Sequence, residues 1–265
     1  MNYAFTSKDF TFFNNLILKA GQLALDIQKS DFNIERKSDN TIVTKADFEV
    51  QELIVDSVKK HYKHVNLVHE ENFNKTINNF HNDELTIIID PIDGTSVFSM
   101  RLPLWCISLG VFKGFEPVYG FVYSPASDFY FYNDNDNAFL NNKPVKIINN
   151  LQITRESCFF CASEIPNAIA SFPGKIRNFG STAFHASLLA DNARNNVFAF
   201  IGESYLWDWA GAIPIILKAG GHISYCDGSI IDFESVVKNK YHFPKPLVAY
   251  ACNDFKDVKR WLRKR

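Results

Sequence analysis

Residues 85–95 read Leu-Thr-Ile-Ile-Ile-Asp-Pro-Ile-Asp-Gly-Thr, and this stretch decides how the chain is interpreted. The apolar run Leu85–Ile89, rich in β-branched side chains, predicts a buried strand. Pro91 cannot donate a hydrogen bond to a central ladder, so we expect the strand to stop there. Asp90 and Asp93 are then expected at the carboxyl edge of a sheet, where α/β proteins bind ligands.

The two residues that follow add a second half to this site. Gly94 and Thr95 lie where the chain must turn, and their backbone N–H groups can cradle phosphate oxygens. The carboxylates of Asp90 and Asp93 would repel such a ligand unless cations lie between them. The pattern therefore indicates hard divalent ions, with magnesium the best suited.

Composition limits the classes of function. The 265 residues suffice for one large or two small domains, and 46% hydrophobic and 15% aromatic residues predict a packed globular protein. A net charge of −1 gives no electrostatic basis for binding nucleic acid or an anionic membrane. The chain lacks ~20 uninterrupted apolar residues, so no membrane span is expected.

A cysteine phosphatase needs an arginine six positions after its cysteine, and Cys106, Cys158 and Cys161 lack one there.

Cellular location is predicted from both the amino-terminal stretch and the cysteines. Residues 1–8 show no basic region followed by an apolar core, so no secretory signal is expected. Five scattered cysteines indicate reduced thiols and a cytoplasmic protein. Cys158 and Cys161 have the spacing of a redox motif, but their apolar surroundings favour core positions.

Hydrophobic periodicity divides the chain into two parts, which we place at residues 1–148 and 149–265. In the first part, helical spacing predicts helices over 8–29 and 45–61, followed by a mostly antiparallel sheet. Its strands are expected at 65–69, 85–89, 104–112, 116–123 and 129–132, with a hairpin turn at Lys113-Gly114.

The second part alternates between strand and helix signals, an α/β pattern. Strands at 157–162, 175–179 and 197–201 are each followed by a predicted helix, at 165–171, 182–192 and 208–219. Pro214 should kink the last helix or lie near its first turns. The predicted fold class is thus α+β in the first part and α/β in the second.

Four motifs in order resemble one enzyme family. Asp90-Pro-Ile-Asp93-Gly-Thr95 resembles the first signature of the inositol monophosphatase family of magnesium-dependent, lithium-sensitive phosphatases. Trp207–Ala212, followed by Ala219-Gly-Gly221, resembles its second signature, and the other two motifs are Asn40–Asp47 and His69–Glu71. The resemblance implies a layered α-β-α-β-α sandwich, a homodimer and a small phosphorylated substrate.

The resemblance also implies roles for individual residues. The implied metal ligands for two or three Mg²⁺ ions are Glu70, Asp90, the carbonyl of Ile92, Asp93 and Asp208. The implied catalytic residues are Glu70, which orients the attacking water, and Thr95, whose hydroxyl polarises it and passes its proton toward Asp47. The implied substrate contacts are Asp93, Gly94, Thr95, Gly180, Ser181, Thr182 and Glu203.

Several of these residues also have simpler interpretations. Thr44-Lys-Ala-Asp47 has the form of a capping box, so Asp47 could serve only a helix start. Asp208 begins a predicted helix, where an acid is favoured by the helix dipole. Lys37 could neutralise the site, although we predict a surface lysine. His69 stands where the family usually has glycine, so it could touch substrate.

The substrate is where the chain departs from the family. Inositol-preferring members have an acidic residue seven positions before the second-signature aspartate, and this chain has Ile201 there. Glu203 could replace it if the loop Gly202–Leu206 bends suitably. Arg101–Trp105 resembles the histidinol-phosphate phosphatase branch, and a 3′-phosphonucleotide phosphatase remains an alternative. A hypothesis of another class is a non-catalytic regulatory or binding protein on the same fold.

Overall fold

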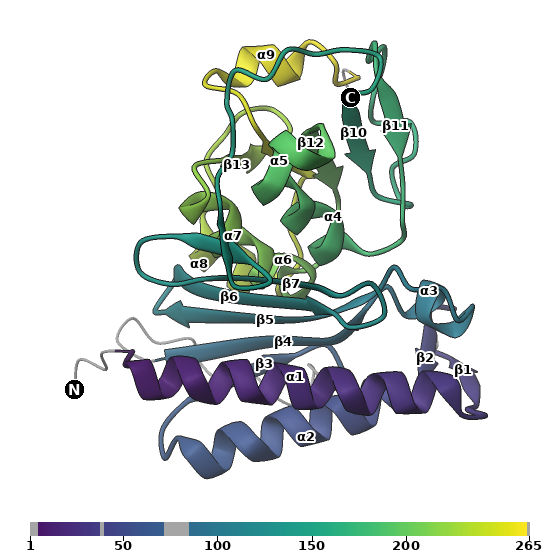
Figure 1. Ribbon diagram of the computed structural model, residues 1–265, viewed down its shortest axis with the longest axis vertical. Coiled ribbons are helices and arrows are strands. Elements are labelled where there is room, and N and C mark those ends of the chain that lie inside the picture. The colour runs from purple at the N-terminus through teal and green to yellow at the C-terminus, as the bar shows by residue number, and fades with distance from the viewer. Residues whose placement is uncertain (1–4, 38–39, 72–84, 264–265) are drawn as a thin grey trace.

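The computed structural model describes residues 5–37, 40–71 and 85–263, which fold around two β-sheets (Figure 1). Residues 1–4, part of the stretch expected to lack a secretory signal, lie outside the described residues. The elements up to the end of the first sheet are α1 (Ser7–Lys29), β1 (Ile34–Arg36), β2 (Ile42–Thr44), α2 (Lys45–His61), β3 (Asn66–His69), β4 (Leu85–Asp93), α3 (Thr95–Ser99), β5 (Cys106–Lys113), β6 (Glu116–Ser124), β7 (Phe129–Asn133), β8 (Ala138–Leu140) and β9 (Lys143–Val145).

The remaining elements form the second sheet and its helices. They are β10 (Cys158–Cys161), β11 (Lys175–Arg177), α4 (Thr182–Leu188), the 3₁₀ helix η2 (Leu189–Asp191), α5 (Asn192–Asn195), β12 (Val197–Gly202), α6 (Leu206–Ala210), α7 (Ala212–Lys218), β13 (His222–Tyr225), α8 (Phe233–Lys238), β14 (Leu247–Tyr250) and α9 (Phe255–Lys259).

The first sheet has seven strands in the order β3-β4-β5-β6-β7-β8-β9. Only β3 and β4 pair in parallel; the other pairs are antiparallel, as predicted, and Gly114 lies in the hairpin between β5 and β6. The prediction that β4 stops at Pro91 is wrong. The strand continues to Asp93 because a bulge between Asp90 and Asp93 places one extra residue opposite β5, which removes Pro91 from the regular ladder.

The second sheet has the order β11-β10-β12-β14-β13, with β10, β11 and β12 parallel. The helix predicted at 165–171 does not form. Turns replace it, because Pro166 lacks a backbone N–H and Ile169 pairs instead with Leu262 in an isolated bridge. The helix predicted at 208–219 is divided into α6 and α7 at Gly211, and Pro214 lies in the first turn of α7 as expected. The helix predicted at 182–192 gives way to η2 after Leu188.

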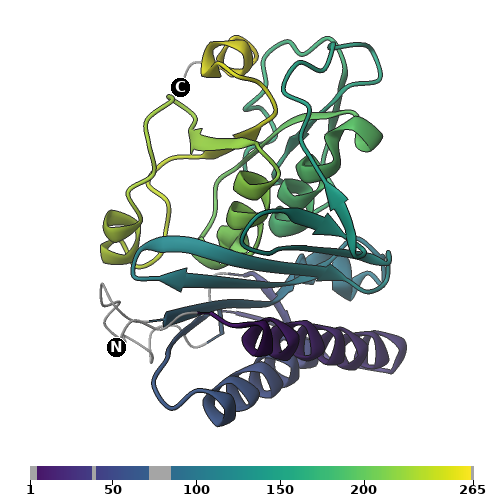
Figure 2. The same ribbon diagram turned by 60° about the vertical axis from the view of Figure 1, so that its left-hand side comes forward.

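The helices lie in layers on the two sheets. Helices α1 and α2 cover one face of the first sheet, and α4, α6 and α7 lie between its other face and the second sheet (Figures 1 and 2). The short α9 is at the end of the molecule farthest from α1 and α2 (Figure 1). Capping boxes begin both long helices, with Thr6 and Asp9 in α1 and Thr44 and Asp47 in α2. The predicted fold class, a layered sandwich of helices and mixed sheets, is confirmed.

Two glycines let the middle helices approach the first sheet closely. A Cβ atom at Gly110 of β5 would lie 2.5 Å from the carbonyl oxygen of Ala210. At Gly120 of β6 it would lie 1.8 Å from the carbonyl oxygen of Gly211. Real side-chain carbons do not approach backbone this closely, so only glycine allows α6 to lie here.

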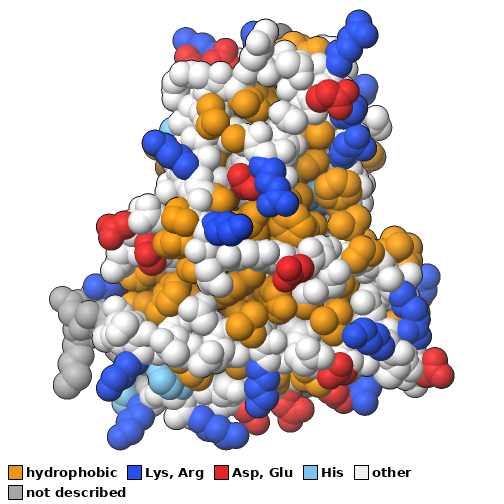
Figure 3. All heavy atoms as spheres, viewed as in Figure 1, with side chains coloured by type: hydrophobic (Ala, Val, Ile, Leu, Met, Phe, Trp, Pro, Cys, Tyr) orange, Lys and Arg blue, Asp and Glu red, His pale blue; other side chains and the backbone are white. Residues whose placement is uncertain are grey.

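The surface carries both signs of charge. On the face shown in Figure 3, lysine and arginine side chains alternate with acidic and apolar ones. Among the described residues, no helix combines the length and apolar character that crossing a membrane requires. All five cysteines are free thiols, and Cys158 and Cys161 are both buried on β10, which confirms their predicted core positions.

Candidate active site

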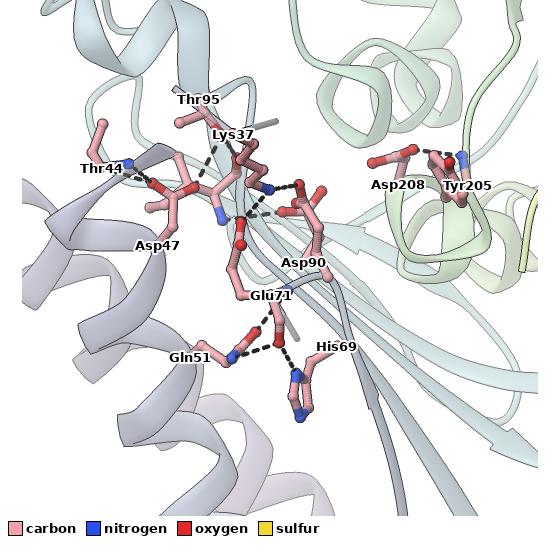
Figure 4. Close-up of polar contacts among 12 residues, drawn as sticks. Lys37, Thr44, Asp47, Gln51, His69, Glu71, Asp90, Thr95, Tyr205 and Asp208 are labelled. Carbon is pink, nitrogen blue, oxygen red and sulfur yellow. Dashed lines mark hydrogen bonds and ion pairs between the residues drawn. The ribbon is translucent and has the colours of Figure 1, made fainter. Parts of the chain in front are cut away.

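Three aspartates converge where the first sheet meets the middle helices. Asp90 and Asp93 lie at the carboxyl end of β4, and Asp208 lies in the first turn of α6. One carboxylate oxygen from each lies within 4.8 Å of the other two. In Figure 4, Asp90 lies between Asp47 on one side and Asp208 on the other. Asp208 also accepts a hydrogen bond from the backbone N–H of Tyr205 at 2.8 Å, so its helix-start role holds as well.

Asp90 and Asp93 are buried and Asp208 is half-buried, so their negative charges lack full solvation by water. Burial raises the pKa of Asp90 well above its usual range, and the negative charges of Glu70 and Asp93 raise it further. Burial likewise raises the pKa of Asp208, with Asp93 and Glu70 adding to the effect. A bound cation would remove this cost, and a donor set of carboxylate oxygens suits a hard divalent ion.

Asp93 also ties the first sheet to the start of α4. Its carboxylate accepts hydrogen bonds from the backbone N–H of Thr182 at 3.0 Å and of Ala183 at 2.6 Å, and from the hydroxyl of Ser181. Burial raises the pKa of Asp93 to about 6, and these hydrogen bonds limit the rise. The buried Cys106 thiol, 3.5 Å from the same carboxylate, was not among the residues predicted from the sequence.

Asp47 makes the contacts that each of its two interpretations requires. Its Oδ2 accepts hydrogen bonds from the backbone N–H of Thr44 at 2.8 Å and from the Thr44 hydroxyl at 2.7 Å, which forms the capping box. Its Oδ1 lies 3.0 Å from the Thr95 hydroxyl, which is also 3.0 Å from the Ile92 carbonyl oxygen. The Thr95 hydroxyl has one proton, but two acceptors lie within hydrogen-bond distance of it. A protonated Asp47 would donate to the Thr95 oxygen, and Thr95 would then donate to the Ile92 carbonyl oxygen.

The ionisation of Asp47 is compatible with such proton sharing. Burial raises its pKa to about 7, the hydrogen bonds from Thr44 oppose the rise, and the charges of Glu70 and Glu71 add to it. A carboxyl group with a pKa near neutrality can both hold and release a proton at physiological pH.

Lys37 lies in the site, so the prediction of a surface lysine is wrong. Its ammonium group contacts Glu70 Oε1 at 2.9 Å and Glu71 Oε1 at 2.6 Å, and its side chain is 26% exposed. Burial lowers the pKa of Lys37, but the two carboxylates outweigh this effect and raise it above its usual range. Glu70 thus points one oxygen toward Lys37 and lies outside the convergent group of three aspartates.

The residues beside Glu70 have structural contacts. The side-chain amide of Gln51 brackets the backbone of Glu71, with hydrogen bonds of 3.0 and 3.1 Å (Figure 4). The His69 Nδ1 lies 2.5 Å from the Glu71 carbonyl oxygen and therefore donates to it. Burial lowers the pKa of His69. His69 thus supports the backbone of Glu71 and does not line the site cavity.

His185 is a site residue that sequence reasoning missed. The ring is 1% exposed and stacks between Phe179 and Phe200, with centroids 5.2 Å away on each side. The backbone N–H of Phe179 donates to Nε2 at 2.6 Å, while Nδ1 donates to the carbonyl oxygen of Ser181. Burial lowers its pKa to about 4, so the ring is neutral. No metal-ligand spacing marked it in the sequence, because its partners are backbone atoms.

A cavity of about 1080 Å³ opens over this group. All seven residues predicted to contact substrate line it, and they are Asp93, Gly94, Thr95, Gly180, Ser181, Thr182 and Glu203. Glu70 and Asp208 line it too, whereas Asp47, Asp90 and Ile92 lie below its surface. The structure therefore brings the predicted site residues together from both sheets.

The profile of the inositol monophosphatase family matches residues 7–253. The chain belongs to the inositol monophosphatase family. Inositol monophosphatase 1 of Solanum lycopersicum is 29% identical over 84% of this chain and 88% of its own length. The fructose-1,6-bisphosphatase/inositol-1-monophosphatase of Thermotoga maritima is 29% identical over 80% of this chain and 83% of its own length.

Solved structures of an IMPase and of a suhB protein have the same fold. An IMPase of Thermotoga maritima superposes with a TM-score of 0.78 at 26% identity, covering 95% of this chain and 94% of that one. The extragenic suppressor protein suhB of Bartonella henselae gives 0.80 at 21% identity, covering 97% and 99%. Both relatives described above are named as phosphatases. As a member of the inositol monophosphatase family, this chain is therefore a metal-dependent phosphatase.

Proposed function

We propose that this protein hydrolyses the phosphate monoester of a small alcohol by in-line attack of water, with magnesium as its metal. The observation that carries the proposal is the convergence of one oxygen each from Asp90, Asp93 and Asp208 within 4.8 Å. Glu70 and the Ile92 carbonyl complete the proposed ligand set. When bound, about two or three magnesium ions would neutralise the phosphate and polarise its oxygens.

The chain's own groups have proposed tasks in the proton transfer. Glu70 orients the attacking water from the wall of the cavity. The Thr95 hydroxyl takes a proton from that water and passes its own toward Asp47, 3.0 Å away. Lys37 holds Glu70 in place through its 2.9 Å ion pair. The loop Gly180–Thr182, clamped to Asp93, contacts the phosphate ester beside Gly94.

We propose that inositol 1-phosphate is not the preferred substrate. Ile201 is 2% exposed and lacks a polar atom to pair with a sugar hydroxyl, and an unpaired hydroxyl costs about 1–3 kcal/mol. Glu203 lies just past the end of β12 and lines the site cavity, so it can accept such a hydrogen bond. Histidinol phosphate and 3′-phosphonucleotides are the alternative substrates.

Phosphate release from a panel of esters tests the proposal. The panel contains inositol 1-phosphate, histidinol phosphate, fructose 1,6-bisphosphate, adenosine 3′,5′-bisphosphate and glycerol phosphate, each with magnesium and with excess chelator. We expect magnesium-dependent release, with inositol 1-phosphate not ranked first. A clear preference for inositol 1-phosphate would contradict the substrate proposal and identify Glu203 as the replacement acceptor. No release from any ester would favour the non-catalytic binding protein.

We further propose a cytoplasmic homodimer. The five free cysteines support a reducing compartment, and the homodimer rests on the family resemblance alone. Light scattering at micromolar concentration should give twice the 30.3 kDa chain mass. A monomer would remove the assembly proposal and leave the catalytic one untouched.

A further inference from the structure

Glu70, the proposed metal ligand outside the three convergent aspartates, lies in a turn that the preceding side chain closes. Strand β3 ends at His69, and the chain leaves the first sheet through Glu70 and Glu71. The Nδ1 of His69 donates to the carbonyl oxygen of Glu71 at 2.5 Å (Figure 4). This hydrogen bond spans Glu70, so it restrains the backbone dihedral angles of that one residue.

Two other elements hold the same turn. The backbone N–H of Glu70 donates to the carbonyl oxygen of Ile89 at 3.2 Å, which continues the pairing of β3 with β4 by one residue. The side chain of Gln51, on α2, donates to the Glu71 carbonyl oxygen at 3.0 Å and accepts from the Glu71 N–H at 3.1 Å. Because Ile89 directly precedes Asp90, this arrangement sets Glu70 beside Asp90.

The electrostatics of the site reflect this proximity. Burial raises the pKa of Asp90 most, and the charge of Glu70 is the next largest cause of the rise. The Glu70 side chain also lines the site cavity. His69 is 8% exposed and does not line the cavity, so its ring is not placed to touch a ligand there. An effect of His69 on the site must therefore pass through the backbone of the turn.

We propose that His69 is a positioning residue for magnesium: by closing the turn across Glu70, it holds this carboxylate in place before the cation binds. The inference rests on the role of Glu70 as a metal ligand proposed above. Without the His69 hydrogen bond, Gln51 alone holds the Glu71 carbonyl, and the turn opens more often. Only molecules with a closed turn present Glu70 to the cation, so the apparent affinity for magnesium falls with the closed fraction.

Two substitutions separate the hydrogen bond from the volume of the ring. His69→Phe keeps a ring in the buried space but has no donor, whereas His69→Asn keeps a donor nitrogen the same number of bonds from the backbone. Calorimetry without substrate measures the dissociation constant for magnesium. We expect His69→Phe to raise it about fivefold, the effect of losing one hydrogen bond of ordinary net strength. His69→Asn should remain within about twofold of the unchanged protein.

Amide hydrogen exchange in the metal-free protein reports on the turn directly. The Glu71 amide, which donates to Gln51, should exchange about fivefold faster in His69→Phe and at an unchanged rate in His69→Asn. In steady-state kinetics at saturating magnesium, KM for the ester should be the same in both variants, since residue 69 does not line the cavity.

Val68→Ala is the control for a general loss of stability. Val68 precedes His69 on β3 and is 2% exposed, so the substitution lowers Tm without removing a contact of the turn. It should leave the affinity for magnesium unchanged, whereas His69→Phe should lower the affinity even where its Tm is no lower than that of Val68→Ala.

The outcomes distinguish this inference from the phosphatase proposal. The inference is overturned if His69→Phe binds magnesium like the unchanged protein, or if Val68→Ala or His69→Asn loses affinity to the same extent. Because calorimetry and exchange need no catalysis, absence of phosphate release together with the expected His69 effect would overturn the phosphatase proposal alone. Absence of magnesium binding to the unchanged protein would overturn both.

Discussion

The carboxylate of Asp93 accepts a hydrogen bond of 2.6 Å from the backbone N–H of Ala183, across 90 residues of sequence. One side chain thus belongs to the convergent aspartates and also holds the start of α4. The proposed metal group and the proposed phosphate-facing loop are therefore coupled, since a displacement of Asp93 moves both.

This coupling predicts that asparagine substitutions at Asp90 and at Asp93 have different effects on the kinetics. Asp90→Asn and Asp93→Asn should each lower kcat by roughly 100-fold or more, because each weakens the cation site. Asp93→Asn should in addition raise KM, because the loop donates hydrogen bonds to both carboxylate oxygens and an amide keeps only one acceptor oxygen. Steady-state kinetics over a magnesium titration measures both effects. Asp232→Asn, at the exposed start of α8, is the control, and identical KM values for the two site variants would contradict the coupling.

Thr95 and Asp47 should act as a unit. Thr95→Ala and Asp47→Asn are each expected to lower kcat by about 100-fold or more with little change in KM, because both interrupt one proton path. The double variant should be about as slow as either single one. Asp47→Asn should also lower the free energy of unfolding by about 1 kcal/mol through its capping box. Strictly additive rate losses would mean that Asp47 only caps the helix.

Magnesium should stabilise the protein more at pH 8 than at pH 5. Burial raises the pKa of Asp47 to about 7 and that of Asp93 to about 6. In the unfolded chain an aspartate has a pKa of about 4. A raised pKa contributes stability that is fully present below the unfolded value and lost as the pH rises through 6 to 7. The metal-free protein should therefore melt at a lower temperature at pH 8, and magnesium should restore it. A magnesium-induced shift in Tm that is equal at both pH values would contradict this account.

His185 should help to fix the position of the loop Gly180–Thr182, which Asp93 also holds by hydrogen bonds. His185→Phe keeps the stack on Phe179 and Phe200 but leaves the Phe179 N–H without its ring partner; the Ser181 carbonyl loses the ring hydrogen bond and keeps only the one from the backbone N–H of residue 185. Because an unsatisfied buried group costs about 1–3 kcal/mol, we expect a lower Tm and a raised KM. Magnesium affinity, measured by calorimetry, should change less than KM.

His222→Phe is the matched control for this change, because His222 is a half-buried ring that stacks on Tyr250 in the second sheet. It should leave KM unchanged. A His185→Phe enzyme with the KM of the unchanged protein would show that the loop is held by Asp93 alone.

Local patterns in the sequence predicted the parts of the site that depend on neighbouring residues. The capping box of Thr44 and Asp47 follows from a spacing of three residues, and the convergence of Asp90 and Asp93 from one strand end. The end of β4 was predicted wrongly at Pro91 because a bulge needs the partner strand β5, which the local pattern does not contain. The helix predicted at 165–171 does not form for a similar reason. Ile169 pairs with Leu262, which is distant in the sequence and therefore absent from the local pattern.

Contacts between distant residues were not predictable from spacing. Lys37 meets Glu70 and Glu71 across more than 30 residues, so the sequence pattern of a lysine in a loop gave no sign of burial. His185 and Cys106 act on the site through backbone atoms and a thiol, which leave no motif. The pairing of Thr95 with Asp47 came from family resemblance, since 48 residues separate them.

The close approach at Gly110 and Gly120 has a consequence for how this enzyme can vary. Asp208 is carried by α6, whose height above β5 and β6 is set by the missing side chains of these two glycines. An alanine at either position would lift the helix and widen the gap between Asp208 and the β4 aspartates, although no acidic residue would be replaced. Tuning of cation preference is therefore available to this protein without altering any residue that would touch the cation.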